Sequence, residues 1–198
     1  MIKLGLTGSI GMGKSTAAGF FADEGVPMHD ADAVVHRLYE GAAVPAIEAA
    51  FPGTTVGGKV DRERLAARVL DDPPALAHLE AIIHPLVRRE EEKFLTKAEA
   101  AGAKVAVLNV PLLFETGGDE RCDAIVVVSA PAAVQRQRVM ARPGMTEAKL
   151  ASLIAKQLPD AEKRRRADFV VDTSGDFDST RAQIRAILEK VAELPKRR

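Results

Sequence analysis

The sequence has little cysteine and no excess of charge of either sign. Its single cysteine, Cys122, cannot form a disulfide within the chain, and one thiol does not support a zinc site. Lys and Arg number 28 and Asp and Glu number 28, which gives a formal net charge of zero. Proteins that act on nucleic acids usually carry a basic excess. We therefore expect no nucleic-acid partner, and local clusters of cations must bind any anionic substrate.

The sequence also has no apolar run of the length that a membrane span requires. Its first residues, Met1 to Leu6, lack the charged start, long apolar run and cleavage site of a signal peptide. We therefore expect a cytoplasmic protein without a membrane partner. Hydrophobic residues make up 46% and charged residues 28% of the 198 positions, which is typical of a globular protein with a sizeable core.

Five short apolar segments predict β-strands. They lie at 2–6, 26–30, 105–110, 124–128 and 169–172. The third and fourth are apolar at every position or nearly so, as in parallel strands that helices cover on both faces. Helical patterns at 16–24 and from Asp178 onward alternate with the strands. The sequence therefore predicts the α/β class, with a doubly wound parallel sheet flanked by helices.

The segment from 32 to 102 differs from the rest because it lacks convincing strands. Its apolar residues follow helical spacing at Leu76, Leu79, Ile82, Ile83 and Leu86. Pro85 is expected to kink or restart this helix, with His84 as a structural cap. We therefore predict a helical insertion at 32–102 in a core formed by 1–31 and 103–198. The basic end, Lys196 to Arg198, is expected to be a frayed tail.

A glycine-rich segment follows the first predicted strand and matches the pattern G-x-x-x-x-G-K-[ST]. Its glycines let amide N–H groups face an anion, and the next helix points its partly positive N-terminus at the phosphates. Lys14 would bridge the outer phosphates, and Ser15 offers a hard oxygen ligand to Mg²⁺. The strand before it and the helix after it are the context that such a motif requires. The expected ATP contacts are Gly8, Ser9, Ile10, Gly11, Met12, Gly13, Lys14, Ser15 and Thr16.

Two carboxylates, Asp30 and Asp32, follow the second predicted strand. Residues two apart in an extended chain point to the same side, and the carboxyl ends of parallel strands open onto the ligand crevice. One or both can accept the proton of an acceptor hydroxyl, or hold Mg²⁺ through a water. The alternative is that Asp32 caps the helix that follows it, a role that aspartate often takes.

Three arginines, Arg136, Arg138 and Arg142, lie in a predicted helix that Pro143 ends. Arg138 and Arg142 are four residues apart and would share one face. Guanidinium donors suit the negative charge that spreads over a phosphoryl group during transfer, and a kinase also needs a lid that excludes water. The alternative, three arginines on a solvated face, fits the sequence equally well.

Other polar residues carry weaker signals. Asn109 ends the third predicted strand, where a Walker B site would place an aspartate, and it can accept a hydrogen bond from a magnesium-bound water. Glu115 is interpreted as a loop carboxylate. The run from Lys163 to Arg166 is interpreted as the solvated end of a helix.

These pieces together resemble the bacterial dephospho-CoA kinase family along nearly the whole chain. The phosphate loop alone indicates only a superfamily, but the other motifs, in this order, are far more selective. They are Leu6-Thr7-Gly8 with the loop, Asp30-Ala31-Asp32, Val60-Asp61-Arg62, Leu79-Glu80 with His84-Pro85, Pro111-Leu112-Leu113-Phe114-Glu115, Gln135 with Arg138 and Arg142, Gln157, and Ala167-Asp168-Phe169.

The resemblance implies a core like that of nucleoside monophosphate kinases, a coenzyme A-binding insertion and a mobile lid at about 136–158. It implies that Mg²⁺-ATP phosphorylates the ribose 3′-hydroxyl of dephospho-CoA, with the chain acting as a monomer or a weak, concentration-dependent oligomer. The catalytic groups that it implies are Asp32, Lys14, Arg142 and Arg138. The acceptor contacts that it implies are Thr7, Asp32, His84 and Leu112.

Two positions depart from the pattern of the family. Asn109 stands where aspartate is common, and Asp172-Thr173 stands where asparagine is frequent. The surroundings of Mg²⁺ and the contacts to adenine are therefore expected to differ there. Two other functions would also use the loop, namely a different small-molecule kinase and a nucleotide-dependent switch. A GTP switch needs an Asn-Lys-x-Asp segment, which the sequence lacks.

Overall fold

The computed structural model describes residues 1–194, so the predicted tail at Lys196 to Arg198 lies outside the described residues. The chain forms two compact units, a core unit of Met1–His29 with the chain from Ala98 onward, and an insertion unit of Asp30–Lys97. These boundaries lie a few residues before those expected from the sequence. Helix α5 (Pro73–Ala100) carries the chain across the second boundary, so no loop marks it.

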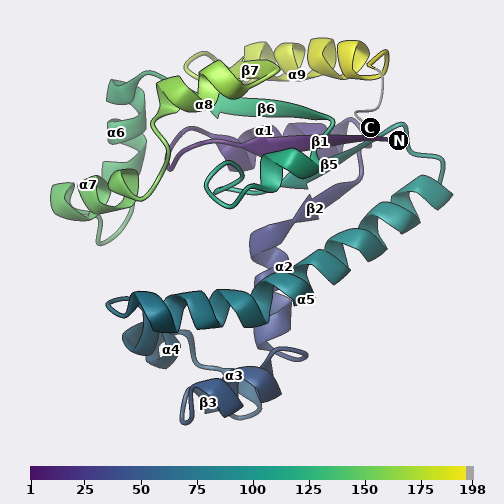
Figure 1. Cartoon of the computed structure of the whole chain (residues 1–198). Coiled ribbons are helices and arrows are strands. Elements are labelled where there is room, and N and C mark those ends of the chain that lie inside the picture. Colours follow the sequence, from purple (N-terminus) through teal and green to yellow (C-terminus); the bar gives the residue numbers. More distant parts are fainter. Residues whose placement is uncertain (195–198) are drawn as a thin grey trace. The chain divides into compact units, whose positions relative to one another are not determined.

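The core unit is built on a five-stranded sheet in the order β2-β5-β1-β6-β7 (Figure 1). The strands are β1 (Ile2–Thr7), β2 (Met28–Asp30), β5 (Val105–Asn109), β6 (Ala124–Ser129) and β7 (Phe169–Asp172). The pairs β1–β5, β1–β6 and β6–β7 are parallel. All five strands were expected from their apolar runs, and the parallel α/β class is confirmed.

Helices α1 (Lys14–Asp23) and α9 (Phe177–Val191) pack on one face of this sheet. Alternate strand residues such as Leu4 and Val126 meet Phe21 of α1 and Ile184 of α9 in one buried cluster. Full burial of a large apolar side chain contributes roughly 1.5–3 kcal/mol, so this cluster fixes the ends of the strands relative to α1. The remaining core helices are α6 (Ala132–Met140), α7 (Glu147–Ala155), α8 (Asp160–Arg166) and the 3₁₀ turn η1 (Gly118–Arg121).

The insertion unit contains α2 (Ala31–Tyr39), α3 (Val44–Ala50), α4 (Arg62–Val69) and most of α5. It also contains a short antiparallel hairpin of β3 (Thr55–Val56) and β4 (Lys59–Val60), so the prediction of no convincing strands is wrong. Gly57 and Gly58 both have positive φ, 58° and 77°, as the favoured two-residue hairpin turns require. The Gly-Gly pair was the available signal.

Helix α5 runs without a break through Pro85. The predicted restart is therefore wrong, and His84 lies inside the helix, exposed, and does not cap it. Proline removes one N–H donor, but the apolar contacts of Ile83 before it and Leu86 after it with the core of this unit stabilise both sides of it. The expected apolar stripe of this helix is confirmed except at Leu76, which is 38% exposed.

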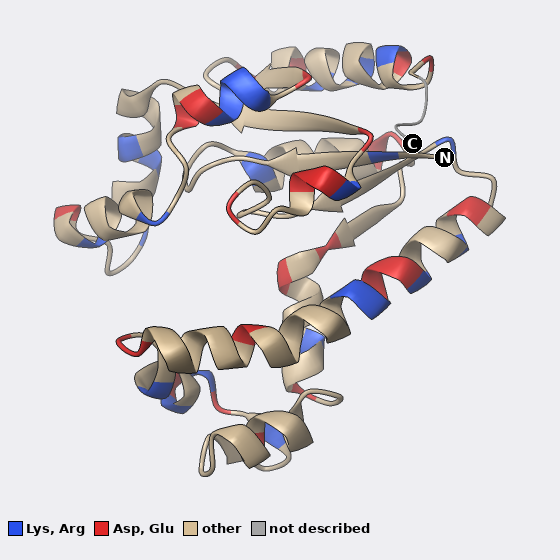
Figure 2. Ribbon diagram, viewed as in Figure 1, with Lys and Arg blue, Asp and Glu red and all other residues tan. Residues whose placement is uncertain are grey.

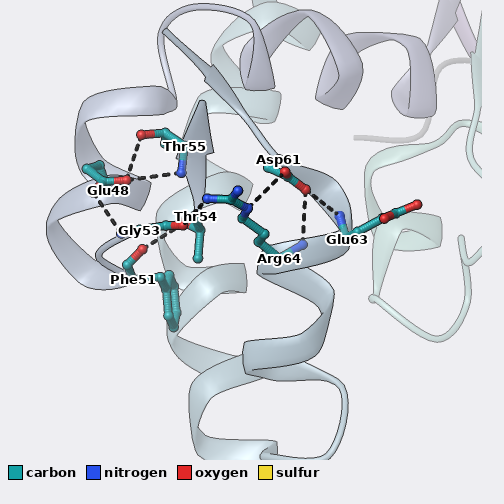
Figure 3. A network of polar contacts seen from close by, with 8 residues as sticks. All are labelled: Glu48, Phe51, Gly53, Thr54, Thr55, Asp61, Glu63 and Arg64. Carbon is teal, nitrogen blue, oxygen red and sulfur yellow. Dashed lines mark hydrogen bonds and ion pairs between the residues drawn. The ribbon is translucent and has the colours of Figure 1, made fainter. Parts of the chain in front are cut away.

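Polar contacts within the insertion unit are local and close its turns (Figure 3). The carboxylate of Glu48 accepts hydrogen bonds from the backbone N–H of Gly53 at 2.8 Å and from the Thr55 hydroxyl at 2.6 Å. Asp61 caps α4 by accepting from the N–H groups of Glu63 and Arg64, both at 3.1 Å. These contacts explain why a polar segment between α3 and α4 holds one conformation.

Basic and acidic residues are both spread over the helices of both units (Figure 2). Several exposed pairs join neighbouring turns of one helix, such as Lys93 with Glu90 and Arg165 with Glu162. Exposed pairs of this kind contribute about 0–1 kcal/mol each. Within residues 1–194, no helix is both long and apolar enough to cross a membrane.

Candidate active site

The phosphate loop connects β1 to α1 in the core unit, between Thr7 and Lys14. Gly13 caps α1 with φ 87°, and a Cβ atom there would lie 2.9 Å from the Thr173 hydroxyl, so only glycine fits. The first turn of α1 has no acidic residue, and no side chain caps it. The N–H groups of this turn therefore face outward with the positive end of the helix dipole, as an anion site requires.

Lys14 reaches the end of the neighbouring strand β5. Its Nζ atom donates a hydrogen bond of 2.7 Å to Oδ1 of Asn109, which is 3% exposed. In the parallel register Asn109 pairs with Leu6, one residue before β1 ends, so the ends of the two strands lie side by side. Asn109 thus holds the lysine without the negative charge that an aspartate would add.

Thr173 lies beneath the loop at the end of β7 and is 6% exposed. Its hydroxyl donates to the Met12 carbonyl at 2.8 Å. Arg138 of α6 donates to the same hydroxyl at 3.0 Å and to the Thr173 carbonyl at 2.6 Å. Arg138 therefore holds the base of the loop in this conformation, a role that no sequence pattern indicated.

Asp172, the preceding residue, is exposed and its pKa lies below the usual value. Hydrogen bonds from the backbone and side chain of Ser174 are the main cause, and the positive charges of Arg164 and Arg138 add to the effect. The carboxylate is therefore ionised over the whole physiological range. Its negative charge balances Arg138 at the end of β7.

A buried ion pair links the segment after β5 to α8. Lys163 is completely buried, and its Nζ atom lies 2.9 Å from Oε1 of Glu115 and 3.5 Å from the Pro111 carbonyl. The Thr7 hydroxyl donates to the same carbonyl at 2.9 Å, and the Leu158 N–H donates to Glu115 at 2.7 Å. The interpretation of Lys163 as solvated is wrong, and Glu115 is more than a loop carboxylate.

Burial of the Glu115 carboxyl raises its pKa, but the hydrogen bonds from Lys163 and Leu158 outweigh that effect. The pKa of Glu115 therefore lies below its usual value, and its carboxylate is charged at neutral pH. Thr7 is fully buried, with its hydroxyl bonded to Pro111. In this conformation Thr7 positions the segment that carries Leu112, whose side chain is 38% exposed and accessible to a ligand.

The three arginines are not on one helical face. Helix α6 ends at Met140, so Arg142 lies in the turn after it, and the shared-face argument is wrong. Pro143 explains the early end, because the residue before a proline disfavours helical angles. Arg136 pairs with Glu147 at the start of α7. The side chain of Arg142 is exposed and, within residues 1–194, forms no hydrogen bond or ion pair.

In the insertion unit, Asp30 and not Asp32 caps α2. The Asp30 carboxylate accepts from the Ala33 N–H at 2.9 Å, and its φ and ψ of −100° and 109° are extended. Asp32 lies in the first turn, exposed, and its carboxylate makes no hydrogen bond or ion pair with any described residue. The capping interpretation of Asp32 is therefore wrong. His84 is exposed on α5 of the same unit.

Sequence reasoning missed Lys163 and Thr173 as residues that hold the loop region. A signal existed for Lys163, because α8 reads Asp-Ala-Glu-Lys-Arg-Arg-Arg and contains no large apolar residue. A helix of that composition can pack on a sheet only by turning the aliphatic stem of a long cation inward. Thr173 had no comparable signal, since its contacts join residues that are far apart in the chain.

Similarity to known proteins agrees with this geometry. The sequence model of the dephospho-CoA kinase family matches residues 2–179. A dephospho-CoA kinase of Rhodopseudomonas palustris is 62% identical over 198 residues, which cover 100% of both chains. One from Brucella melitensis is 58% identical over 195 residues and covers 98% of each chain.

Solved structures show the same fold. A crystal structure from Thermus thermophilus superposes with a TM-score of 0.85 at 37% identity, over 96% of this chain and 97% of that one. A dephospho-CoA kinase from Campylobacter jejuni, 20% identical, has a TM-score of 0.66 over 96% of each chain. The family match spans the phosphate loop, Asn109 and Thr173, so it covers the whole site described above. The chain belongs to the dephospho-CoA kinase family.

Proposed function

We propose that the chain transfers the γ-phosphate of ATP to the ribose 3′-hydroxyl of dephospho-CoA, giving coenzyme A and ADP in the final step of coenzyme A biosynthesis. The observation that carries this proposal is the loop between β1 and α1, in which Lys14 is hydrogen-bonded to Asn109. It is supported by relatives that match the chain along its whole length. In the transfer, the hydroxyl oxygen bonds to the γ-phosphorus, the bond to the β–γ bridging oxygen breaks, and the hydroxyl proton goes to a base.

Asp32 is the proposed base. Asp30 already caps α2, so the Asp32 carboxylate is not needed for the helix and stays exposed without a partner in the described chain. It follows the last residue of β2 by two positions, and ligands of α/β folds bind beyond the carboxyl ends of the strands. His84 and Leu112, both exposed, remain the proposed contacts of the acceptor.

The cations have separate proposed roles. Lys14 stabilises the charge on the outer phosphates, since it is already fixed beside the loop. Arg142 is the proposed lid arginine, because its guanidinium is exposed and makes no hydrogen bond or ion pair within residues 1–194. Arg138 is proposed to act through Thr173, which it holds under the loop.

Mg²⁺ is proposed to accompany ATP. Mg²⁺ usually keeps several waters and binds through one or two protein oxygens together with the phosphates. Ser15, exposed in the first turn of α1, offers such an oxygen, and the described residues hold no cluster of three or more His, Cys, Asp or Glu as an alternative cage. The bound ion would neutralise charge that develops on the phosphate oxygens. We also propose that the enzyme acts as a cytoplasmic monomer.

An acceptor panel tests the proposed function. The protein is incubated with Mg²⁺-ATP and dephospho-CoA, adenosine, AMP, shikimate or gluconate, and ADP release is measured. We expect turnover with dephospho-CoA and little with the others. The Lys14→Ala variant, assayed in parallel, controls for contaminating kinases. Strong preference for another acceptor would contradict the proposal, and ATP binding without transfer to any acceptor would favour a nucleotide switch.

The Asp32→Asn variant tests the proposed base. It should lower turnover by about 10²-fold or more while ATP binding is retained, as expected for loss of a positioned base. Asp30→Asn is the matched control two residues away, because asparagine caps helices as well as aspartate. We expect that control to keep most of the turnover. Near-normal turnover of Asp32→Asn would show that this carboxylate is not the base.

A further inference from the structure

One residue of the phosphate loop, Ile10, is bonded through both of its backbone polar groups to side-chain amides. The Ile10 N–H donates to Oε1 of Gln157 at 3.1 Å. The Ile10 carbonyl accepts from Nε2 of Gln135 at 2.8 Å. A backbone N–H can only donate and a carbonyl can only accept, so these partners fix which end of each amide faces the loop.

The two glutamines stand at the two ends of one helical arm, α6 with α7. Gln135 lies in α6 and is 8% exposed, and Gln157 lies two residues after α7 ends. The arm between them carries Arg142, the proposed lid arginine, and α6 and α7 pack against each other. The arm is therefore attached to the loop at both of its ends, through a single residue.

These bonds determine which amides of the loop can face the phosphates. The Ile10 N–H is directed to Gln157 and is not part of the anion site. The peptides on either side of Ile10 are held, while no side chain caps the first turn of α1. A cradle of N–H groups binds phosphate well only if its peptide planes are already oriented.

We propose that Gln135 and Gln157 form a clip on Ile10 that keeps the phosphate loop in its ATP-binding conformation and couples it to the α6–α7 arm. Neither glutamine touches ATP in this proposal, so both are positioning residues. The inference deepens the proposed function, since its kinetic readout rests on that reaction. Its binding readout needs only ATP and stays valid if the acceptor is a different one.

The opposite polarity of the two bonds gives a test with conservative variants. At position 157, glutamate keeps the oxygen that accepts the hydrogen bond from the Ile10 N–H. At position 135, glutamate replaces the amide N–H donor with an oxygen acceptor, which then faces the Ile10 carbonyl. Both substitutions add the same charge to the same arm. Gln137→Glu adds that charge to the exposed face of α6 and is the matched control.

ATP affinity is measured by calorimetry for wild type, Gln137→Glu, Gln157→Glu and Gln135→Glu. Leaving the partly buried Ile10 carbonyl unpaired costs enough that the Kd of Gln135→Glu should rise about tenfold or more over the control. Gln157→Glu should stay within about threefold of the control because its bond is kept. Lowering the pH should restore affinity in Gln135→Glu, whose protonated carboxyl can donate, but not in Gln135→Met.

Steady-state kinetics separate positioning from simple stability. The KM for ATP should rise in Gln135→Glu while the KM for dephospho-CoA stays unchanged, a split that a loss of stability alone does not produce. If Gln135→Glu does not fold, the ATP affinities of Gln157→Leu and Gln157→Glu test the proposal. We expect weak ATP binding only in Gln157→Leu. Equal ATP affinity in all three glutamate variants, or in Gln157→Leu and Gln157→Glu, would overturn the proposal.

Discussion

The polar contacts of the two units join residues at very different separations along the chain. In the core unit, the bonds that hold the phosphate loop connect Lys14 to Asn109, 95 residues away, and Met12 to Thr173, 161 residues away. Such bonds exist only when the whole sheet has formed. The half of the site that binds ATP is therefore organised by tertiary folding before any ligand arrives.

In the insertion unit, the contacts are short-range. Glu48 bonds to Thr55, 7 residues away, and Asp61 bonds to the Arg64 N–H, 3 residues away. They shape turns and helix ends, and they leave Asp32 and His84 exposed. The difference indicates a preorganised donor site in the core, and we propose that the acceptor residues gain their final contacts from the ligand. Three substitutions can break or sharpen this comparison.

The largest effect is expected from Lys163→Met in the core unit. Removing Lys163 leaves the partly exposed Glu115 carboxylate without its cation, which costs about 1–3 kcal/mol. Urea unfolding measures the change in the free energy of unfolding. Arg164→Met, the exposed neighbour in α8, should change it by less than about 0.5 kcal/mol. A loss of under about 1 kcal/mol in Lys163→Met would show that the pair does not organise the core.

A smaller effect is expected from Asp61→Ala in the insertion unit. The variant removes the cap of α4 and should cost about 1 kcal/mol of unfolding free energy. ATP affinity should stay unchanged, because the contacts of Asp61 are local. Asp71→Ala, an exposed carboxylate after the same helix, is the control for loss of charge. Weakened ATP binding in Asp61→Ala alone would break the contrast between the two units.

The smallest effect is expected from the titration of Glu115. Its pKa in the folded protein is lowered from 4.5, so its contribution to stability is present above about pH 4.5 and is lost as the pH falls through the lower folded value. Melting temperatures of wild type and Glu115→Gln, measured between about pH 3 and 7, should therefore converge at the acid end. A constant difference across that range would contradict the lowered pKa.

Much of the fold could be predicted because strands and loop carry local signals. The apolar runs of β5 and β6 and the pattern from Gly8 to Ser15 each specify a structure within a few residues. Errors arose where two local rules competed. At Pro85, the packing of Leu79 and Ile83 outweighed the tendency of proline to end a helix. At the start of α2, Asp30 and Asp32 were both possible caps, and Asp30 caps the helix.

The sequence by itself determined the class of fold, the place of the ATP phosphates and the resemblance to one kinase family. Those conclusions depend on the order and spacing of residues along the chain. Only the tertiary structure showed that Lys163 is buried against Glu115, that Arg138 holds Thr173, and that two glutamines share Ile10. The physical reason is that each of these bonds joins segments brought together by the sheet, and no local pattern encodes which distant partner a polar group will meet.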